Sequence, residues 1–555
     1  MTNQLRVALA QLNPTVGDIA GNVALLRAAR AEASKDRADL VIAPELVVTG
    51  YPPEDLVLRR AFMDAVEAAV GVLAEETDDG GPGLILGTPW REGEKLHNAV
   101  LLLDGGTIRA KRFKHDLPNY GVFDEKRVFA PGPLPGPADF RGVRLGLLVC
   151  EDMWTPDVVE CLSETGAEML IVVNGSPFDD GKQDEREQLA RERVRESGLP
   201  LVYVNQVGGQ DELVFDGASF VLNGDGTGAA LLAPWESQVV VTAWTRGADG
   251  WRCAEGPIVR PAPRLETIYR AMVTGLRDYV GKNRFPSVVI GLSGGIDSAI
   301  TAAVAVDALG PGRVHCVSLP YKYTAQQSVD DARECAKRLG CRFDIVSIEP
   351  SVEAFKAMMK PLFAGRREDV TEENLQARAR GVTLMAISNK FGAMVLTTGN
   401  KSEMSVGYAT LYGDMCGGFS VLKDVYKTTV YDLVRWRNQQ PPKGALGPAG
   451  TVIPEAIIVR PPTAELRPGQ KDQDSLPPYD RLDDILECLV ERALPFSDVV
   501  ARGHDPAVVE RMARLLDLAE YKRRQAPPGV KISRRSFGRE RRYPITNAFR
   551  ERAGD

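Results

Sequence analysis

The chain has 555 residues, a formal net charge of −7 at pH 7, and 44% hydrophobic against 26% charged residues. This length exceeds what one hydrophobic core usually supports, so we expect two or more domains. The composition is that of a soluble globular protein, and the acidic balance argues against nucleic acid as a partner. No apolar run approaches membrane-spanning length and no signal-peptide pattern is present, so we expect no membrane partner and a cytoplasmic location. Eight scattered cysteines exclude a disulfide scaffold.

Residues 1–245 alternate strand-like and helix-like segments. Short apolar runs predict strands, and longer runs with apolar residues three or four apart predict amphipathic helices. Some strands are joined by tight turns and others by helical crossovers, which favours mixed sheets in a layered α/β sandwich. We expect strands at 5–10, 40–43, 83–87, 100–103, 143–149, 169–173, 201–204 and 239–243, and helices at 21–34, 58–77 and 184–197.

Three segments of this first half carry reactive side chains. Glu45 follows the strand at 40–43, Lys114 precedes a loop that holds Glu125, and Cys150 ends the most apolar strand. A carboxylate can accept the proton of a thiol, and an ammonium stabilises negative charge as it develops. Each residue alone also has an ordinary explanation: Glu45 as a cap at the end of a strand, Lys114 as a solvated charge, and Cys150 as a thiol in the core. Spacing alone does not bring the three together.

In their sequence contexts, Glu45, Lys114 and Cys150 resemble the Glu-Lys-Cys triad of the nitrilase superfamily. The resemblance implies an α-β-β-α sandwich over residues 1–245, with Cys150 as nucleophile, Glu45 as general base and Lys114 as oxyanion stabiliser. Glu125 matches the additional active-site glutamate of that family. A site of this kind attacks a non-peptide amide, forms a thioester and releases ammonia.

The same resemblance places three further residues around a bound glutamine. Each also has an ordinary explanation, as a packing aromatic, a turn residue or a solvated loop charge. The three residues are Tyr120, Ser176 and Lys182.

Residues 246–264 are rich in Gly, Asp and Pro and are predicted to be a linker. A helix pattern at 265–281 begins the second domain, 265–555, in which strand and helix patterns alternate. This alternation predicts a doubly wound parallel sheet, whose ligands bind at the carboxyl ends of the strands. Residues 437–481 are rich in Pro, Gly and Gln and are predicted to form a long loop. The expected strands are 288–290, 314–319, 343–348 and 393–398.

Residues 288–298, VVIGLSGGIDS, join a β-branched run to an Ala-rich helical pattern through a Gly-rich turn. Such a turn lets backbone N–H groups approach a phosphate at a helix N-terminus. It lacks the Gly-Lys-Ser/Thr of a P-loop, although the hydroxyls of Ser293 and Ser298 suit phosphate and the carboxylate of Asp297 suits Mg²⁺. A tight turn that needs positive φ would also explain the glycines.

The string Ser-Gly-Gly-Ile-Asp-Ser resembles the pyrophosphate loop of the ATP pyrophosphatases, a Rossmann-like fold family. The resemblance implies cleavage of ATP between its α and β phosphates and adenylation of a substrate. The implied ATP-binding residues are Gly291, Leu292, Ser293, Gly294, Gly295, Ile296, Asp297 and Ser298.

Segments 320–328, 373–378, 397–403 and 407–414, with Pro-Thr at 462–463, resemble glutamine-dependent NAD synthetases over essentially the whole chain. The resemblance implies that nicotinic acid adenine dinucleotide, ATP and glutamine give NAD⁺, AMP, pyrophosphate and glutamate, with an adenylate as the intermediate. It also implies a large homo-oligomer and a shielded path for ammonia between the two sites. Carried over by position, the resemblance assigns ATP contacts to Thr398, Lys423 and Thr463, and a shared Mg²⁺ to Asp297 and Glu403. It places five residues at the dinucleotide site: Asn374, Arg378, Glu403, Asp414 and Lys522. These residues also have ordinary explanations, as solvated charges, a helix cap or the start of a loop.

Three alternatives stay open. The acceptor can be another nucleotide-linked carboxylate or a base, and the first half can be a non-catalytic scaffold. The basic, aromatic tail at 521–543 also suits RNA, although the phosphates of a dinucleotide explain its arginines.

Overall fold

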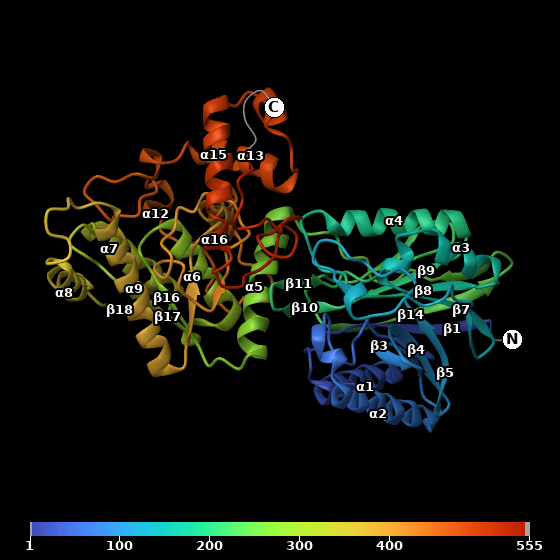
Figure 1. Cartoon of the computed structure of the whole chain (residues 1–555). Helices are drawn as coiled ribbons and strands as arrows, with labels where there is room; N and C mark the ends of the chain where they lie inside the picture. Colours follow the sequence, from blue (N-terminus) through green and yellow to red (C-terminus); the bar gives the residue numbers. More distant parts are fainter. Residues whose placement is uncertain (1–2, 550–555) are drawn as a thin grey trace. The chain divides into compact units, whose positions relative to one another are not determined.

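Two packed β-sheets form the middle of the first half of the structure, a computed structural model that describes residues 3–549 (Figure 1). The chain divides into two compact units, Met1–Pro261 and Ala262–Asp555. One sheet of the first unit has seven strands in the order β15-β14-β1-β2-β3-β4-β5, and the other has six in the order β13-β12-β9-β8-β7-β6.

Both sheets are mixed, as the sequence pattern predicts. The β1-β2-β3 and β7-β8-β9 pairs are parallel, and the remaining pairs are antiparallel. The strands are β1 (Gln4–Gln11), β2 (Leu40–Ile42), β3 (Gly83–Glu92), β4 (Lys95–Asp104), β5 (Thr107–Phe113), β6 (Ala138–Phe140), β7 (Val143–Val149), β8 (Met169–Asn174), β9 (Leu201–Asn205), β12 (Phe220–Leu222), β13 (Gly228–Leu231), β14 (Gln238–Gly247) and β15 (Gly250–Cys253), with a separate hairpin of β10 (Val207–Gln210) and β11 (Leu213–Asp216).

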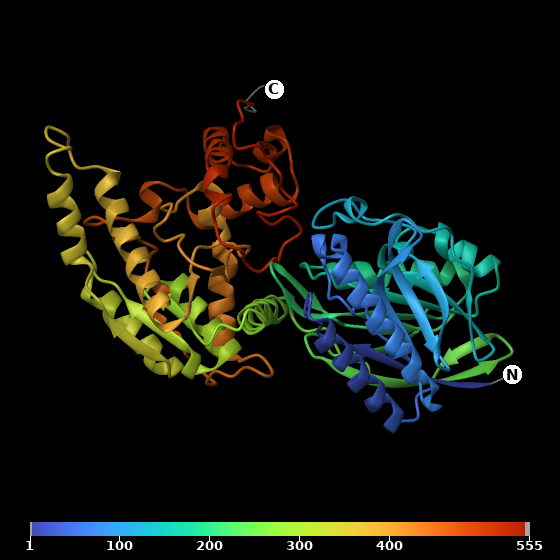
Figure 2. The same cartoon turned by 60° about the horizontal axis from the view of Figure 1, so that its bottom comes forward.

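Alternation along the strands divides the apolar side chains between layers. On β1, Val7 and Leu9 pack between the two sheets, whereas Ala8 and Ala10 pack against α1 (Ile19–Lys35) and α2 (Arg60–Glu75). On the far sheet, α3 (Asp157–Glu164) and α4 (Lys182–Ser197) provide the outer layer. In Figures 1 and 2, α1 and α2 lie together on one side of the strands. The predicted α-β-β-α sandwich is confirmed.

The segment 246–264, predicted to be a linker, is structured over part of its length. Its residues Gly250–Cys253 form β15, which pairs antiparallel with β14 at the edge of the seven-stranded sheet. The buried side chains of Trp251 and Cys253 join the core between the sheets, which outweighs the turn-forming composition around them. The boundaries of the two domains stay a prediction.

A five-stranded parallel sheet organises the second unit, in the order β18-β17-β16-β19-β20. The chain runs outward from β16 to β18 and then crosses to the other side of β16. The switch between β16 and β19 is the place where doubly wound sheets bind ligands. This is the predicted fold of the second half. The strands are β16 (Val288–Gly291), β17 (Val314–Ser318), β18 (Arg342–Ile345), β19 (Met394–Thr397) and β20 (Phe419–Ser420).

Helices cover this sheet and form a separate bundle near the C-terminus. The last long helices share a small apolar core of their own. The helices are α5 (Arg264–Lys282), α6 (Ile296–Leu309), α7 (Gln326–Leu339), α8 (Glu349–Met359), α9 (Val370–Phe391), α10 (Lys401–Val406), α11 (Lys427–Gln439), α12 (Glu455–Val459), α13 (Tyr479–Leu486), α14 (Phe496–Ala501), α15 (Pro506–Leu518) and α16 (Glu520–Arg523).

The prediction of one long loop over 437–481 is wrong in part. The helix α11 extends into this segment to Gln439, and α12 forms within it because Ile457 and Ile458 are buried. Among residues 3–549, no helix combines the length and apolar character needed to cross a membrane.

A buried ion pair joins three helices of the second unit. Arg437 on α11 donates to both carboxylate oxygens of Asp307 on α6, at 2.5 and 2.8 Å, and the Tyr269 hydroxyl on α5 donates to the same carboxylate at 2.7 Å. The side chains of Arg437 and Asp307 are both fully buried. Removing one partner would leave a charge without compensation in the interior.

We expect Arg437→Leu to lower the free energy of opening of α6 by about 3–5 kcal/mol, because Asp307 loses its cation. Native-state hydrogen exchange of the α6 peptides measures this change. Arg435→Leu is the matched control: its side chain is 56% exposed and lies 4.0 Å from Asp432, so the change should stay within about 1 kcal/mol. Equal effects of the two substitutions would contradict the assigned role of the pair.

Candidate functional site

A buried lysine between two carboxylates lies at the centre of the first unit. The Lys114 ammonium donates to Glu45 Oε1 at 2.8 Å and to Glu125 Oε1 at 2.9 Å. The exposed fractions are 1% for Lys114, 0% for Glu45 and 5% for Glu125. Three of the predicted catalytic residues, which are up to 80 positions apart in the chain, therefore form one hydrogen-bonded cluster.

The Glu45 carboxylate is held from several sides. Its Oε2 accepts the backbone N–H of Gly175 at 2.8 Å, and its Oε1 accepts the side-chain amide of Asn98 at 2.7 Å. Asn98 lies on β4 and also reaches Glu125 at 3.4 Å. On β3, a Cβ at Gly87 would lie 2.5 Å from Glu45 Cα, so only glycine leaves room for the loop that carries this carboxylate.

Cys150 is the first residue of a short 3₁₀ turn, Cys150–Met153, directly after β7. Its φ of +46° lies in the left-handed region, a strained conformation for a non-glycine residue. Burial and the negative charge of Glu45 raise the pKa of the thiol well above its ordinary value, and the charge of Lys114 opposes them. The resting side chain is therefore a neutral thiol that needs a base when it attacks.

The charges of the cluster act strongly on one another. Burial by itself would lower the pKa of Lys114, but the charges of Glu125 and Glu45 raise it well above its ordinary value. Burial raises the pKa of Glu125 to about 7, with Lys114 opposing and Glu45 adding to the rise. Lys114 thus stays protonated, while Glu125 changes charge near neutral pH.

Two of the three residues predicted to bind glutamine, Tyr120 and Lys182, contact the turn that carries Cys150 or the residue that follows it. The Tyr120 hydroxyl donates to Glu151 at 2.9 Å, and the Lys182 ammonium lies 4.0 Å from the ring centroid of Trp154. Ser176 is buried, and its hydroxyl accepts from Arg186 Nε at 3.0 Å. Glu151 is not among the residues predicted from the sequence, although its position directly after Cys150 was a signal that could have indicated it.

The second unit has a cavity of about 300 Å³ next to the Gly-rich loop. All eight loop residues, Gly291–Ser298, line it, together with residues from the ends of β17 and β19 and from the segment after α12. The cavity therefore lies where the sheet topology places a ligand. The predicted residues that also line it are Thr398, Glu403, Asp414, Lys423 and Thr463.

The loop conformation depends on glycine and on two hydroxyls. Gly294 has a φ of +86°, and a Cβ there would lie 2.2 Å from Ser328 O. Ser298 Oγ accepts the Ser293 N–H at 3.2 Å and donates to Gly295 O at 2.9 Å. Gly295 is the N-cap residue of α6 and provides no side-chain cap, so the first N–H groups of the helix are available to an anion.

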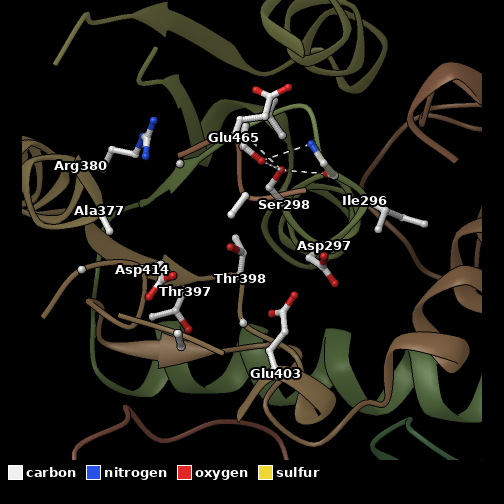
Figure 3. A pocket seen from close by; sticks show the side chains of 18 of the residues that line it. Ile296, Asp297, Ser298, Ala377, Arg380, Thr397, Thr398, Glu403, Asp414 and Glu465 are labelled. Carbon is white, nitrogen blue, oxygen red and sulfur yellow. Dashed lines mark hydrogen bonds between the residues drawn. The ribbon is translucent and has the colours of Figure 1, made fainter. Parts of the chain in front are cut away.

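Lys427, which is not among the residues predicted from the sequence, lies between two acidic residues of the cavity. Its ammonium pairs with Asp297 and lies 3.5 Å from Glu403 Oε1, and its side chain is 2% exposed. Figure 3 shows the side chains of Asp297 and Glu403 directed toward the same space. Lys427 is the first residue of α11, where the helix dipole disfavours a cation. A lysine at this position is therefore expected to have a carboxylate partner, and this was the signal that could have indicated it.

Glu403 is the titratable group of this cluster that is most strongly shifted toward neutral pH. Burial raises its pKa to about 8, the charge of Lys427 opposes this rise, and the charges of Asp297 and Asp472 add to it. The carboxylates of Asp297 and Glu403, whose side chains are 17% and 18% exposed, therefore favour a cation between them.

The predicted dinucleotide residues surround the segment 407–414. Of these residues, Asn374, Arg378 and Lys522 do not line the cavity, whereas Glu403 and Asp414 do. The contacts to the segment are Lys522 Nζ to Gly407 O at 2.8 Å and to Ala409 O at 2.7 Å, Thr410 Oγ1 to Asn374 Oδ1 at 2.9 Å, Thr410 N to Asp414 Oδ1 at 2.7 Å, and Arg378 Nε to Leu411 O at 3.3 Å.

Comparison with known proteins agrees with this division. Residues 6–248 match the carbon–nitrogen hydrolase family, and residues 268–526 match the NAD synthase family. The glutamine-dependent NAD(+) synthetase of Rhodobacter capsulatus is 51% identical over 553 residues, with all of both chains covered, and that of Acinetobacter baylyi is 46% identical, with 98% and 99% covered.

Solved structures show the same likeness. The glutamine-dependent NAD⁺ synthetase of Acinetobacter baumannii, solved in complex with ADP, is 43% identical and superposes with a TM-score of 0.78, covering 99% of this chain and 100% of that one. The synthetase of Cytophaga hutchinsonii shares the fold at 22% identity, with a TM-score of 0.81 and 98% of each chain covered.

The two units and their sites thus define a protein that joins a carbon–nitrogen hydrolase domain to an NAD synthase domain. Because relatives of this family are 51% and 46% identical to it over at least 98% of its length, the chain belongs to the glutamine-dependent NAD(+) synthetase family.

We expect Gly294→Ala to weaken ATP binding at least about tenfold, because the new methyl group meets Ser328 O and a strain of about 1–3 kcal/mol must be relieved by moving the loop. Isothermal titration calorimetry with ATP measures the change. Gly312→Ala is the control, since a Cβ there meets nothing within 4 Å. Unchanged ATP affinity in Gly294→Ala would show that the loop does not bind phosphate.

Proposed function

We propose that this chain converts nicotinic acid adenine dinucleotide into NAD⁺, with ammonia from glutamine and activation by ATP. One observation carries the proposal. A single chain holds the buried cluster of Glu45, Lys114 and Glu125 beside Cys150, and also a cavity headed by the loop Gly291–Ser298. The products are AMP, pyrophosphate and glutamate.

In the first unit, the Cys150 thiol attacks the side-chain amide carbon of glutamine while Glu45 accepts its proton. The ammonium of Lys114 stabilises the oxyanion of the tetrahedral intermediate. Glu45 returns the proton to the amide nitrogen, the C–N bond breaks, and ammonia leaves a thioester on Cys150. Water then attacks the thioester with Glu45 again as base, which releases glutamate and restores the thiol.

In the second unit, the substrate carboxylate attacks the α-phosphorus of ATP and pyrophosphate leaves. A carboxylate is a poor electrophile, and the acyl-adenylate provides AMP as a leaving group. Ammonia attacks the activated carbonyl carbon and displaces AMP. The N–H groups and hydroxyls of the loop suit the pyrophosphate, and Thr398, Lys423 and Thr463 are proposed as further ATP contacts.

Mg²⁺ fits the acidic side of this cavity. Asp297 and Glu403 offer carboxylate oxygens, which Mg²⁺ prefers, and Lys427 lies between them as a cation. Among residues 3–549 no group of three or more His, Cys, Asp or Glu is arranged to hold a metal ion, so phosphate and water would complete the coordination. When bound, the ion would neutralise phosphate charge.

The remaining assignments rest on the family resemblance. They are a dinucleotide site around segment 407–414, a large homo-oligomer, a cytoplasmic location and a shielded path that keeps ammonia unprotonated. The intact cluster around Lys114 speaks against a non-catalytic scaffold. The basic tail is partly used within the chain, because Arg541 pairs with Glu520 and stacks on Tyr543 at 3.7 Å, which weakens the RNA alternative.

The test follows the label of amide-¹⁵N glutamine in a reaction with nicotinic acid adenine dinucleotide and Mg-ATP. We expect the carboxamide of NAD⁺ to carry ¹⁵N, with AMP as co-product. Cys150→Ala should form no labelled NAD⁺ and should retain synthesis from ammonium, because the second site is untouched. Mass spectrometry of the products measures both results.

Each failure has its own meaning. If glutamine is hydrolysed but no NAD⁺ forms, the acceptor is another carboxylate or a base. If Cys150→Ala still uses glutamine, the nucleophile is wrong and the scaffold alternative gains support.

We expect glutamine hydrolysis to rise with pH about a midpoint near 7, the pKa of Glu125. Below this pH Glu125 is neutral, and above it a second negative charge beside Lys114 makes Glu45 a stronger base. Glu125→Gln should remove the midpoint and lower kcat/KM about tenfold or more. Asp124→Asn, a change at the partly exposed neighbour, should leave the profile intact. The pH profile of kcat/KM decides, and an unchanged midpoint in Glu125→Gln would refute the assignment.

A further inference from the structure

One buried carboxylate next to the nucleophile joins the two segments that carry Lys114 and Cys150. Asp152 Oδ1 accepts the backbone N–H groups of His115 at 2.8 Å and Asp116 at 2.9 Å. Its Oδ2 accepts the N–H of Val149 at 3.0 Å. His115 and Asp116 directly follow Lys114, and Val149 directly precedes Cys150. The Asp152 carboxylate is therefore hydrogen-bonded to both backbone segments, the one after Lys114 and the one before Cys150.

The position of this carboxylate is costly. Asp152 is 2% exposed, and within residues 3–549 its hydrogen-bond donors are neutral backbone groups rather than a cation. Burial raises its pKa to about 6, while the backbone donors and the charge of Lys114 act in the opposite direction. A buried charge without an ion-pair partner is unfavourable in itself, so its place in this turn indicates a task other than general stability.

Neighbouring contacts support the same connection. Asp116 Oδ2 accepts the hydroxyl of Thr155 at 2.5 Å, which links the loop after Lys114 to the end of the turn after Cys150. The backbone of Lys114 is itself held at both ends, because its N–H donates to Asn98 O and its C=O accepts from Gly132 N, both at 2.8 Å. The left-handed conformation of Cys150 also requires surroundings that hold it.

We propose that Asp152 is a positioning residue that sets Cys150 Sγ relative to the Lys114 ammonium, so that the oxyanion formed on the glutamine carbonyl meets Lys114. The proposal rests on the glutamine chemistry proposed above. Catalysis of this kind depends on placement, and an error of about 1 Å can cost about 100-fold in rate.

The substitution Asp152→Asn tests this role, since an amide keeps the volume but turns one acceptor into a donor. At least one of the three N–H groups then loses its partner. We expect kcat for glutamine hydrolysis, per titratable Cys150, to fall about 100-fold with KM changed less than about threefold. Synthesis of NAD⁺ from ammonium should be unchanged.

A second measurement is the alkylation of Cys150 by iodoacetamide as a function of pH, followed by mass spectrometry of its peptide. Glu45 raises the thiol pKa and Lys114 lowers it, so a thiol displaced relative to these two charges should titrate at a different pH in Asp152→Asn. Asp225→Asn is the matched control: its carboxylate also holds a turn, through Thr227 N at 2.9 Å, but in an exposed place. It should leave kcat and alkylation unchanged.

Two results would overturn the proposal. One is a kcat per reactive Cys150 equal to that of the unmodified chain, and the other is an alkylation profile that Asp152→Asn does not shift. The alkylation profile does not depend on glutamine. If the unmodified chain fails to hydrolyse glutamine, the proposed function fails, while the alkylation profile still decides whether Asp152 positions the thiol.

Discussion

A buried ammonium needs carboxylate partners, and the first unit is arranged around this requirement. Lys114 at the end of β5 pairs with Glu45 after β2 and with Glu125, and Asn98 on β4 contacts both carboxylates. A charge left alone at this depth would cost several kcal/mol, so the sheet order and the loop geometry must bring these segments together. Burial, together with the negative charge of Glu45, explains why the Cys150 thiol is neutral at rest and why its attack needs a base.

The second unit also contains a buried ammonium that needs carboxylate partners, but its surroundings differ. Lys427 is buried between Asp297 and Glu403, but this cluster opens into a cavity instead of being enclosed. An open cluster beside N–H groups at a helix N-terminus can receive a phosphate together with its cation. The enclosed cluster suits covalent catalysis on a small neutral amide, and the open one suits a large anionic substrate.

Much of the fold and part of the site could be predicted from the sequence. Short apolar runs indicated the central strands of both units, and the string Ser-Gly-Gly-Ile-Asp-Ser indicated the loop that heads the cavity. The strand β15 was missed because it is short and lies among turn-forming residues, and α12 was missed because proline and glycine dominate its surroundings. Lys427 was passed over for Lys423 because burial is not visible in a sequence, and both lysines prove to line the cavity.

The sequence by itself determined the order of the elements, the alternation that builds each layer, and the residue types that the chemistry needs, because these depend on local periodicity and composition. Only the tertiary structure decided which charges meet. The contacts of Lys114 with Glu45, of Lys427 with Asp297, and of Asp152 with the segment after Lys114 span 69, 130 and up to 37 positions. Such contacts arise from the packing of whole sheets and from the energetic cost of unpaired charge in the interior, and no local sequence pattern indicates either of them.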